Sequence, residues 1–196
     1  ELSAAQMEMA QIKVAALQLK RQSQRLYAPG EIISNAYRTL YVSARVPSMV
    51  LERHVILGQH VAPNDALVTL FSTDMAEAQS AFFIALSEWK RVRKLGRNTV
   101  GDKRFTKAKI NAKQAQAKLS ILGMAKKDIA SLPERSKDDI GRYLLRASQS
   151  GTVLSDDFKQ GQQVDSGQAL IKLVDESVLW ADASLAPELG QKILAG

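Results

Sequence analysis

Short apolar runs divided by turns occur twice along the chain, and the two occurrences match without a gap at an offset of 103 residues. Residues 50–71 form the first copy and residues 153–174 form the second. In each copy a glycine turn, at Gly58 or Gly161, is followed by a valine three positions later, a second turn and a closing apolar run. Chance rarely preserves such spacing, so each copy is expected to be half of a small β domain. Half a domain exposes an apolar face, which predicts two halves packed face to face as a flattened β-sandwich.

The residues between the copies follow a heptad pattern, which predicts helices. The first helix has its apolar positions at Met75, Ala78, Phe82, Ala85, Trp89 and Val92. The second has them at Phe105, Ala108, Ala112, Ala115, Leu119 and Leu122. A polar turn at 96–102 separates the helices, so they should fold back as an antiparallel coiled coil whose first helix reaches about 30 Å. Because the apolar stripes are narrow, the hairpin should project from the sandwich.

Together these patterns predict an α+β fold that is elongated and modular. Residues 38–73 and 144–176 are the predicted halves of the β-sandwich, and residues 74–143 are the predicted α-helical hairpin. Residues 1–37 and 177–196 are expected to be the incomplete edges of further β domains. With 45% hydrophobic residues, a chain of 196 residues can bury a core in such modules.

Positive charge is concentrated in the hairpin. The chain has a net charge of +7, and residues 90–127 contain thirteen Lys or Arg against a single acid, Asp102. Two interpretations of this charge are open. In one, the positive hairpin steers association with an acidic partner. In the other, the lysine and arginine side chains only cover the solvated outer face of the coiled coil. Nucleic acid is not expected as the partner, because interleaved aromatic residues and a reading motif are missing. The candidate docking residues are those predicted near the tip, namely Arg93, Lys94, Arg97, Lys103 and Arg104.

The sequence gives no indication of catalysis, and we expect no enzyme and no cofactor. It contains no Ser/His/Asp arrangement, no phosphate-binding glycine loop and no paired acidic motif. His54 and His60 lack further ligands at metal-site spacing, so no metal site is predicted there. The absence of cysteine excludes disulfides and suits the periplasm. No run of 18 apolar residues occurs and the start does not resemble a signal peptide, so neither a transmembrane helix nor a leader is expected.

Near the start of the chain, Ser3 and Gln6 have the spacing of a capping box, which predicts a short helix through Met9. Met7 and Met9 could bind a soft ion through their thioethers. Methionines more often pack, and side chains at i and i+2 point apart on a helix, although they share a face on a strand. The interpretation of these residues as a metal site is therefore the less favoured one.

Several motifs resemble those of periplasmic adaptor subunits, the membrane fusion proteins of the HlyD-like superfamily that serve tripartite RND efflux pumps. The motifs are APGEI at 28–32, AEAQ at 76–79, LSILGM at 119–124 and LWADA at 179–183, together with the split lipoyl-like halves. The residues LGM at the end of the predicted hairpin, followed by Asp128 and Ile129, are similar to those of the heavy-metal branch of these adaptors. This branch contains the CusB-like and CzcB-like proteins. The Arg-Leu-Ser tip signature of drug-pump adaptors has no counterpart at 97–106.

This resemblance implies a barrel-sandwich hybrid domain and an adaptor that links an inner-membrane RND transporter to a TolC-like outer-membrane channel. It implies that several copies assemble into a ring and that the cargo is a heavy-metal cation. The expected location is the periplasm of a Gram-negative bacterium, at the inner membrane, held there by partners or by an anchor outside this segment. Residues 1–37 would then be the segment that leads from the membrane-proximal and β-barrel domains into the sandwich. Residues 177–196 would begin the β-barrel domain.

Three alternatives share parts of this pattern. An adaptor of a multidrug RND pump or of a type I secretion system has the same architecture, although the hairpin of the latter is usually longer. A biotinyl or lipoyl carrier domain has the same two-half sandwich. The carrier needs a lysine in the turn between the halves, and Met75 occupies that position here. The carrier function is therefore disfavoured.

Overall fold

The computed structural model describes residues 3–11, 13, 15–16, 19, 27–135 and 139–187. It divides the chain into two compact units, one of Glu1–Glu31 with Ala183–Gly196 and the other of Ile32–Asp182. In the first unit, helix α1 (Ala4–Met9) begins with the predicted capping box, in which Gln6 N donates to Ser3 Oγ at 3.4 Å and Ser3 N donates to Gln6 Oε1 at 2.9 Å. Many residues near both ends lie outside the described ones, so the domain boundaries expected there stay predictions.

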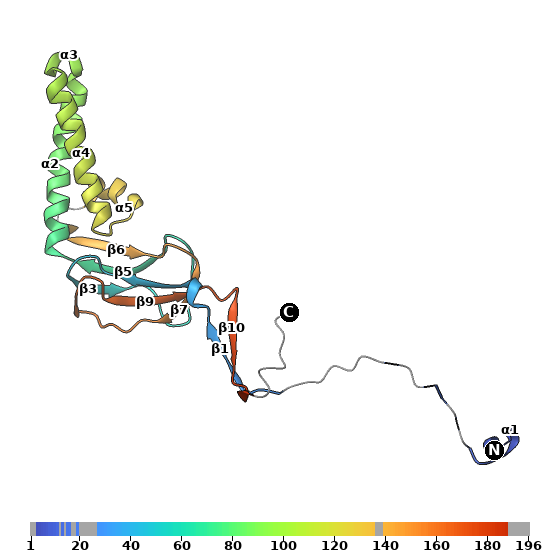
Figure 1. Cartoon of the computed structure of the whole chain (residues 1–196). Coiled ribbons are helices and arrows are strands. Elements are labelled where there is room, and N and C mark those ends of the chain that lie inside the picture. Colours follow the sequence, from blue (N-terminus) through green and yellow to red (C-terminus); the bar gives the residue numbers. More distant parts are fainter. Residues whose placement is uncertain are drawn as a thin grey trace. The chain divides into compact units, whose positions relative to one another are not determined.

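Two four-stranded antiparallel sheets form the β domain of the second unit (Figure 1). The first has the order β2-β9-β7-β4, with bounds Thr39–Ser43, Ala169–Val174, Gly151–Ser155 and His60–Val61. The second has the order β6-β5-β3-β8, with bounds Arg142–Arg146, Ala66–Phe71, Ser48–Arg53 and Gln163–Val164. A 3-10 turn, η1 (Ala36–Arg38), precedes β2, and β1 (Gly30–Ser34) pairs with β10 (Leu179–Ala183) in a separate sheet.

The two copies of the repeat exchange strands. At the offset of 103 residues, each strand of the first copy has an equivalent in the second: β2 corresponds to β6, β3 to β7, β4 to β8 and β5 to β9. The two sheets therefore have equivalent strand orders. However, β4 of the first copy pairs with β7 of the second through His60 and Thr152, and β8 of the second pairs with β3 of the first through Ser48 and Val164. The expectation of one layer per copy was therefore wrong. Each sheet contains strands of both copies, because the glycine turn carries the chain across to the opposite sheet.

The repeated Gly-Gln pair explains how this crossing is built. Gly58 N donates to Val153 O at 2.8 Å, and the equivalent Gly161 N donates to Val50 O at 2.7 Å. Both glycines have positive φ, 79° and 80°, a conformation that costs residues with a Cβ about 1 kcal/mol. The glutamine that follows each glycine accepts a backbone hydrogen bond from three residues earlier, at 3.0 Å for Gln59 and 2.9 Å for Gln162. The repeated residues are thus those that the turn requires.

One ion pair joins equivalent positions of the two copies. Arg53 and Asp156 are separated by the repeat offset of 103 residues, and the Arg53 guanidinium donates to the Asp156 carboxylate and to the carbonyl of Phe158. The guanidinium also lies 4.5 Å from the centre of the Phe158 ring. Both charged side chains are partly buried. The two copies are therefore tied together by a contact whose partners have opposite charges.

The helical hairpin leaves the sandwich after β5 (Figure 1). Helix α2 (Thr73–Leu95) and helix α4 (Asp102–Ile121) pack against each other as the heptads predicted. The segment at 96–102 is more ordered than the predicted turn, because it contains the short helix α3 (Arg97–Val100) between Gly96 and Gly101, both with positive φ. After α4 the chain forms α5 (Lys126–Ser131) and the 3-10 turn η2 (Leu132–Glu134) before it returns to β6.

A single hydrophobic core runs from the sandwich into the base of the hairpin. Apolar side chains of both sheets, such as Val50, Leu67 and Leu173, belong to one buried cluster. Met75, Ala78, Phe82, Leu119, Met124, Ile129 and Leu132, from the hairpin base and the short helices after it, extend this cluster. The sandwich therefore packs directly against the base of the hairpin. None of the helices within the described residues has both the length and the apolar character needed to span a membrane.

Candidate functional site

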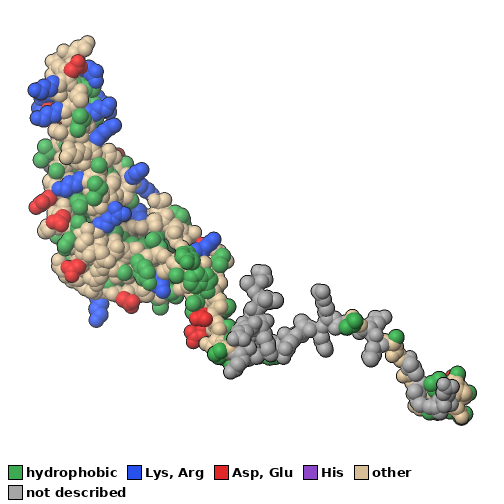
Figure 2. Space-filling view, viewed as in Figure 1, with side chains coloured by type: hydrophobic (Ala, Val, Ile, Leu, Met, Phe, Trp, Pro, Cys, Tyr) green, Lys and Arg blue, Asp and Glu red, His purple; other side chains and the backbone are tan. Residues whose placement is uncertain are grey.

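The candidate site is the tip of the hairpin, where the last turn of α2, helix α3 and the first turn of α4 meet. Figure 2 shows lysine and arginine side chains gathered along the outer half of the hairpin. The structure brings together there all five residues proposed from the sequence, and each of them is exposed, namely Arg93, Lys94, Arg97, Lys103 and Arg104. Their role in docking stays a prediction.

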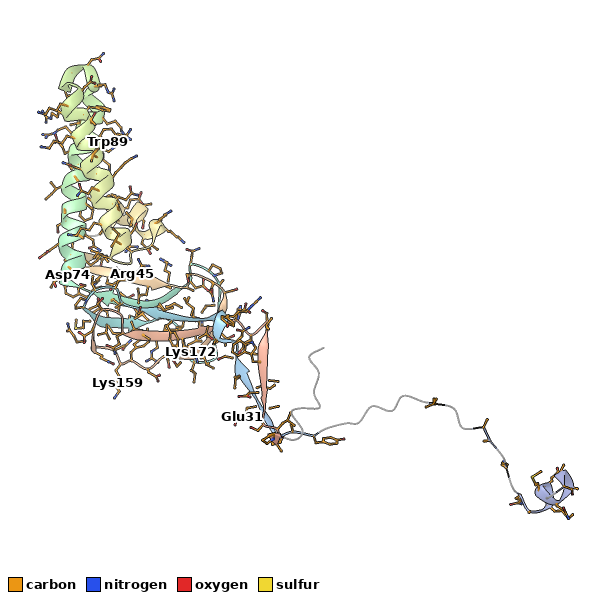
Figure 3. All side chains as sticks on the ribbon, in the orientation of Figure 1. Glu31, Arg45, Asp74, Trp89, Lys159 and Lys172 are labelled. Carbon is orange, nitrogen blue, oxygen red and sulfur yellow. The ribbon has the colours of Figure 1, made fainter. Side chains whose placement is uncertain are left out.

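Aromatic packing holds the two helices together just below the tip. The rings of Trp89 and Phe105 meet edge to face with centroids 5.1 Å apart, an arrangement worth about 1 kcal/mol beyond its buried area. Trp89 is one of the labelled residues in Figure 3. Above this pair, Val92 is fully buried. The basic tip is therefore supported by a packed pair of helices.

Two of the five basic residues are engaged within the chain. The guanidinium of Arg97 lies 5.1 Å from the centre of the Phe105 ring, and its Nε is 3.2 Å from Asp102 Oδ1. Arg104 donates to Glu88 Oε1 from Nη2 at 3.0 Å and from Nε at 3.3 Å. Arg93, Lys94 and Lys103 form no ion pair within the described part of the chain, so their charges are available to a partner.

Glu88 was not singled out in the sequence, although it organises the charges near the tip. Besides Arg104 of α4, it accepts a hydrogen bond from Arg91 one turn further along α2. Arg104 and then Arg91 hold the pKa of this carboxyl below its ordinary value. The carboxylate therefore stays ionised between two arginines and bridges the two helices. Its spacing to Arg91, i to i+3, was the signal that could have identified it.

At the opposite end, a buried glutamine fastens α2 to the sandwich. The side chain of Gln79 has no exposed surface. Its Nε2 donates to Arg142 O at 3.0 Å, and its Oε1 accepts from Gly141 N at 2.7 Å. The side-chain amide of Gln79 therefore makes the hydrogen bonds that a neighbouring strand would make at the start of β6. The backbone groups of Gly141 and Arg142 would otherwise lie beneath α2 without a partner.

A buried carboxylate fastens α5 to the same sheet. Asp128 is 2% exposed. Its Oδ2 accepts from Arg146 Nε at 2.7 Å, and its Oδ1 accepts from Arg146 Nη2 at 2.8 Å and from Arg135 Nη2 at 2.9 Å. Burial alone would raise the pKa of Asp128, but the hydrogen bonds and charges of Arg146 and Arg135 outweigh it and the pKa is lowered. Asp128 is therefore a charged tie between the end of the hairpin and β6.

A third tie lies at the end of α4, where the last carbonyls of the helix need donors. Arg45, which follows β2, donates from Nη1 to the carbonyls of Ser120 at 3.5 Å and Ile121 at 3.3 Å. Figure 3 labels Arg45 at this junction. The base of the hairpin is thus tied to the sandwich at three points.

The histidine His54 lies just after β3 in the sandwich, outside this site. The Nε2 of His54 is 2.7 Å from Thr69 Oγ1, and its Nδ1 is 4.0 Å from Glu52 Oε1. Within the described residues, no three His, Asp or Glu side chains gather as metal ligands. Met7 and Met9 lie on α1, and metal binding by their thioethers remains untested.

Comparison with known proteins agrees with this architecture. The family model of the CzcB-like barrel-sandwich hybrid domain matches residues 38–175, which is more than half of the chain. No curated protein matches the sequence. Among solved structures, ZneB from Cupriavidus metallidurans is 19% identical, with a TM-score of 0.52, over 85% of this chain and 73% of ZneB. A MacA-MexA chimera with the α-hairpin domain of Pseudomonas aeruginosa MexA is 22% identical, with a TM-score of 0.54, over 86% of this chain and 58% of the chimera.

At these identities the solved structures show a shared fold, and the family model shows the relationship. Its match begins just before β2 and ends just after β9, so it includes both sheets and the hairpin between them. The predicted α+β fold, a barrel-sandwich hybrid with an inserted helical hairpin, is thereby confirmed. The chain belongs to the CzcB-like family, the heavy-metal branch of the membrane fusion proteins, which are adaptor subunits of efflux systems.

Proposed function

We propose that this chain is the periplasmic adaptor of a tripartite efflux pump that exports heavy-metal cations. It couples an inner-membrane RND transporter to an outer-membrane channel, several copies assemble around the duct, and it works at the inner membrane of a Gram-negative bacterium. The main observation behind this proposal is the group of exposed basic residues at the tip of a hairpin whose base is tied to the sandwich. The family membership supports it.

The proposed contact is between the basic tip and an acidic channel mouth. Exposed ion pairs contribute about 0 to 1 kcal/mol each, so a single contact is weak and the effect must be collective. Charges at the surface are screened within about 8 Å at physiological ionic strength, so association should slow as salt rises. The three ties at the hairpin base contribute by holding the basic residues in one orientation relative to the sandwich, which reduces the entropy lost on docking.

The test uses reversal of the three tip charges that are unpaired within the described residues, Arg93→Glu, Lys94→Glu and Lys103→Glu. Arg97 and Arg104 are left in place, because their ion pairs with Asp102 and Glu88 stabilise the tip itself. Cells that depend on this adaptor should lose metal resistance, and cross-linking of the hairpin to the channel should be lost. Circular dichroism should show unchanged helix content.

A matched control reverses three exposed lysines at the other end of the hairpin, Lys118→Glu, Lys126→Glu and Lys127→Glu, with the same change in net charge. This variant should retain resistance and cross-linking. Wild-type efflux in the tip variant would contradict docking through the basic tip. Comparing resistance to zinc, copper, cobalt and cadmium salts with resistance to drugs tests the cargo, and protection against drugs alone would contradict metal efflux and favour a multidrug pump.

A further inference from the structure

The hairpin has a groove on its flank that is separate from the basic tip. The groove has a volume of about 590 Å³, and it is lined by residues of α2, α4, α5 and η2. Figure 1 shows α5 beside the lower half of the hairpin. We call this surface the flank groove. Its volume is within the range of sites that hold small organic molecules, about 300 to 1,000 Å³.

The floor of the flank groove is apolar and partly aromatic. Phe82, Leu86 and Trp89 follow each other on α2 at spacings of four and three residues, so they share one face of the helix. Leu86 and Trp89 are half-buried. At about 1.5 Å per residue, the floor from Phe82 to Trp89 is about 10 Å long. Helix α4 contributes the small side chain of Ala112 beside it, so space remains for an elongated apolar group.

The edge of the flank groove is basic. Lys109 and Lys113 line it from α4 and Lys90 lines it from α2, against one acid, Glu134 of η2. Within the described residues none of these three lysines takes part in an ion pair. Lys109 and Lys113 are four residues apart and are therefore neighbours on the surface of α4. Their two ammonium groups can bind a single anion placed between them.

The lysine pair lies beside one end of the apolar floor. The two helices are antiparallel, and Trp89 of α2 packs against Phe105 of α4. Lys109 and Lys113 follow Phe105 by four and eight residues, so they lie about 6 and 12 Å further from the tip. Phe82 lies about 10 Å from Trp89 in the same direction. An anion between the two lysines is therefore close to Phe82, and the floor continues from there toward Trp89.

A second groove of the hairpin, of about 530 Å³, provides a comparison. It is lined mainly by small apolar residues such as Ala81, Ala85 and Ala115. Among the described residues that line it there is no aromatic side chain, and Lys118 is the one that carries a charge. Of these two grooves, only the flank groove combines aromatic side chains with a pair of neighbouring lysines.

From these observations we infer that the flank groove binds an amphipathic anion, namely a carboxylate with an unbranched alkyl chain of about ten carbons, which matches the length of the floor. The carboxylate lies between Lys109 and Lys113, and the chain lies along Phe82, Leu86 and Trp89. A small anion would leave the apolar floor uncovered, and a neutral chain would leave the lysines without a partner. The excess of positive charge disfavours a cation.

Trp89 provides a direct probe of binding, because the chain has only two tryptophans. Trp180→Phe removes the other one, which lies on β10, and leaves Trp89 as the fluorophore of the full chain. Sodium decanoate, kept below its micelle-forming concentration, should shift the emission of Trp89 to shorter wavelength in a saturable way, as the chain displaces water from the ring. Octanoate should bind about fifteenfold more weakly, or about 1.6 kcal/mol for two buried CH₂ groups.

Two ligands of the same chain length test whether the charge is recognised. Decanol, which is neutral, and decyltrimethylammonium, which is a cation, should give no saturable shift at the same concentrations. Equal binding of either one would overturn the inference, because the groove would then not select an anion. No saturable shift with decanoate would also overturn it, and would favour an acidic segment of a partner protein as the occupant.

Substitutions of the lysine pair test the location of the site. Lys109→Glu with Lys113→Glu should weaken decanoate binding at least about tenfold, or about 1.4 kcal/mol, whereas Lys109→Arg with Lys113→Arg should retain it. The matched control, Lys107→Glu with Lys118→Glu, makes the same change in net charge at two lysines of α4 that do not line the flank groove, and it should bind decanoate like the parent.

Circular dichroism should show the same helix content in all three variants. Equal weakening in the control and in the Lys109 and Lys113 reversal would overturn the inference, because it would mean that decanoate responds only to overall charge. The binding assay does not depend on efflux, so the flank groove and the proposed function can fail independently.

Discussion

The two copies of the repeat differ most where the chain leaves the sandwich. After the first copy, Ser72 N donates to Gly141 O at 3.0 Å, and both residues are buried beneath the hairpin. At the equivalent place in the second copy, Asp175 N donates to Arg38 O at 3.2 Å. There the side chains are only partly buried and form an ion pair at 2.7 Å. The same backbone contact is thus used once in a buried joint and once at the surface.

This comparison distinguishes the residues that the sandwich fold requires from the residues that attach the hairpin to it. The turn glycines and glutamines are the same in both copies, so the sandwich needs them. Gly141 and Arg146 correspond to Arg38 and Ser43 in the other copy, so the fold alone does not need them. They are the positions at which Gln79 and Asp128 attach the hairpin. Changes at the two kinds of position should therefore have different effects.

The largest effect is expected for Asp128→Asn, which removes the charge that compensates Arg146. Breaking one side of a buried ion pair costs about 3 kcal/mol, because the remaining charge stays desolvated. Chemical denaturation should show a loss of about this size in the free energy of unfolding. Ser43→Ala, at the position equivalent to Arg146, should change it by less than about 0.5 kcal/mol. Similar losses for both variants would contradict a special role for the hairpin tie.

The same tie should make stability depend on acid pH. The pKa of Asp128 is lowered in the folded protein from its ordinary value of 3.8, so the unfolded chain binds this proton first as pH falls. The contribution of the carboxylate is therefore fully present above about pH 4 and is lost as pH falls through the folded-state pKa. Denaturation curves at several pH values should show that Asp128→Asn lacks this part of the acid destabilisation. A wild-type pH dependence in the variant would contradict the assignment.

A smaller effect is expected for Gly141→Ala. Gly141 has φ of 89°, and an added Cβ would lie 2.5 Å from Phe71 Cε2 and 3.1 Å from Ser72 O. The combined strain and crowding should cost about 2 kcal/mol in unfolding experiments. Arg38→Ala at the equivalent position should cost only about 0 to 1 kcal/mol, because that ion pair is exposed. An equal cost at both positions would remove the distinction between the two joints.

The smallest effects should be equal in both copies. Gly58→Ala and Gly161→Ala face open space, so only the positive φ matters, and each should cost about 1 kcal/mol. Thermal unfolding of the two single variants checks this equality. A large difference between them would mean that the crossings are not equivalent, despite their matching hydrogen bonds.

The elements of the fold could be predicted because their signals are local. The heptads of α2 and α4 and the spacing around Gly58 and Gly161 each depend on periodicity within a short segment. The exchange of strands between sheets could not be predicted, because each copy has the same pattern whichever sheet its strands join. Helix α3 was missed because one helical turn between two glycines has no apolar periodicity.

The candidate site was predictable only in part. The excess of lysine and arginine located the basic tip, since charge along the chain can be counted. The buried ties were missed, because Gln79 and Asp128 are polar residues that a sequence pattern assigns to the surface. Their burial depends on partners more than fifteen residues away, Gly141 for the glutamine and Arg146 for the aspartate. Only the folded chain brings these partners together.

The contact between Arg53 and Asp156 has a consequence for the symmetry of the domain. Equivalent residues of two copies can touch each other only on the pseudo-twofold axis that relates the copies. In a dimer of two identical half-domains, the same place would hold either two arginines or two aspartates, and like charges would repel there. The present ion pair therefore requires two halves that differ at this position, so the two copies of this domain are not interchangeable.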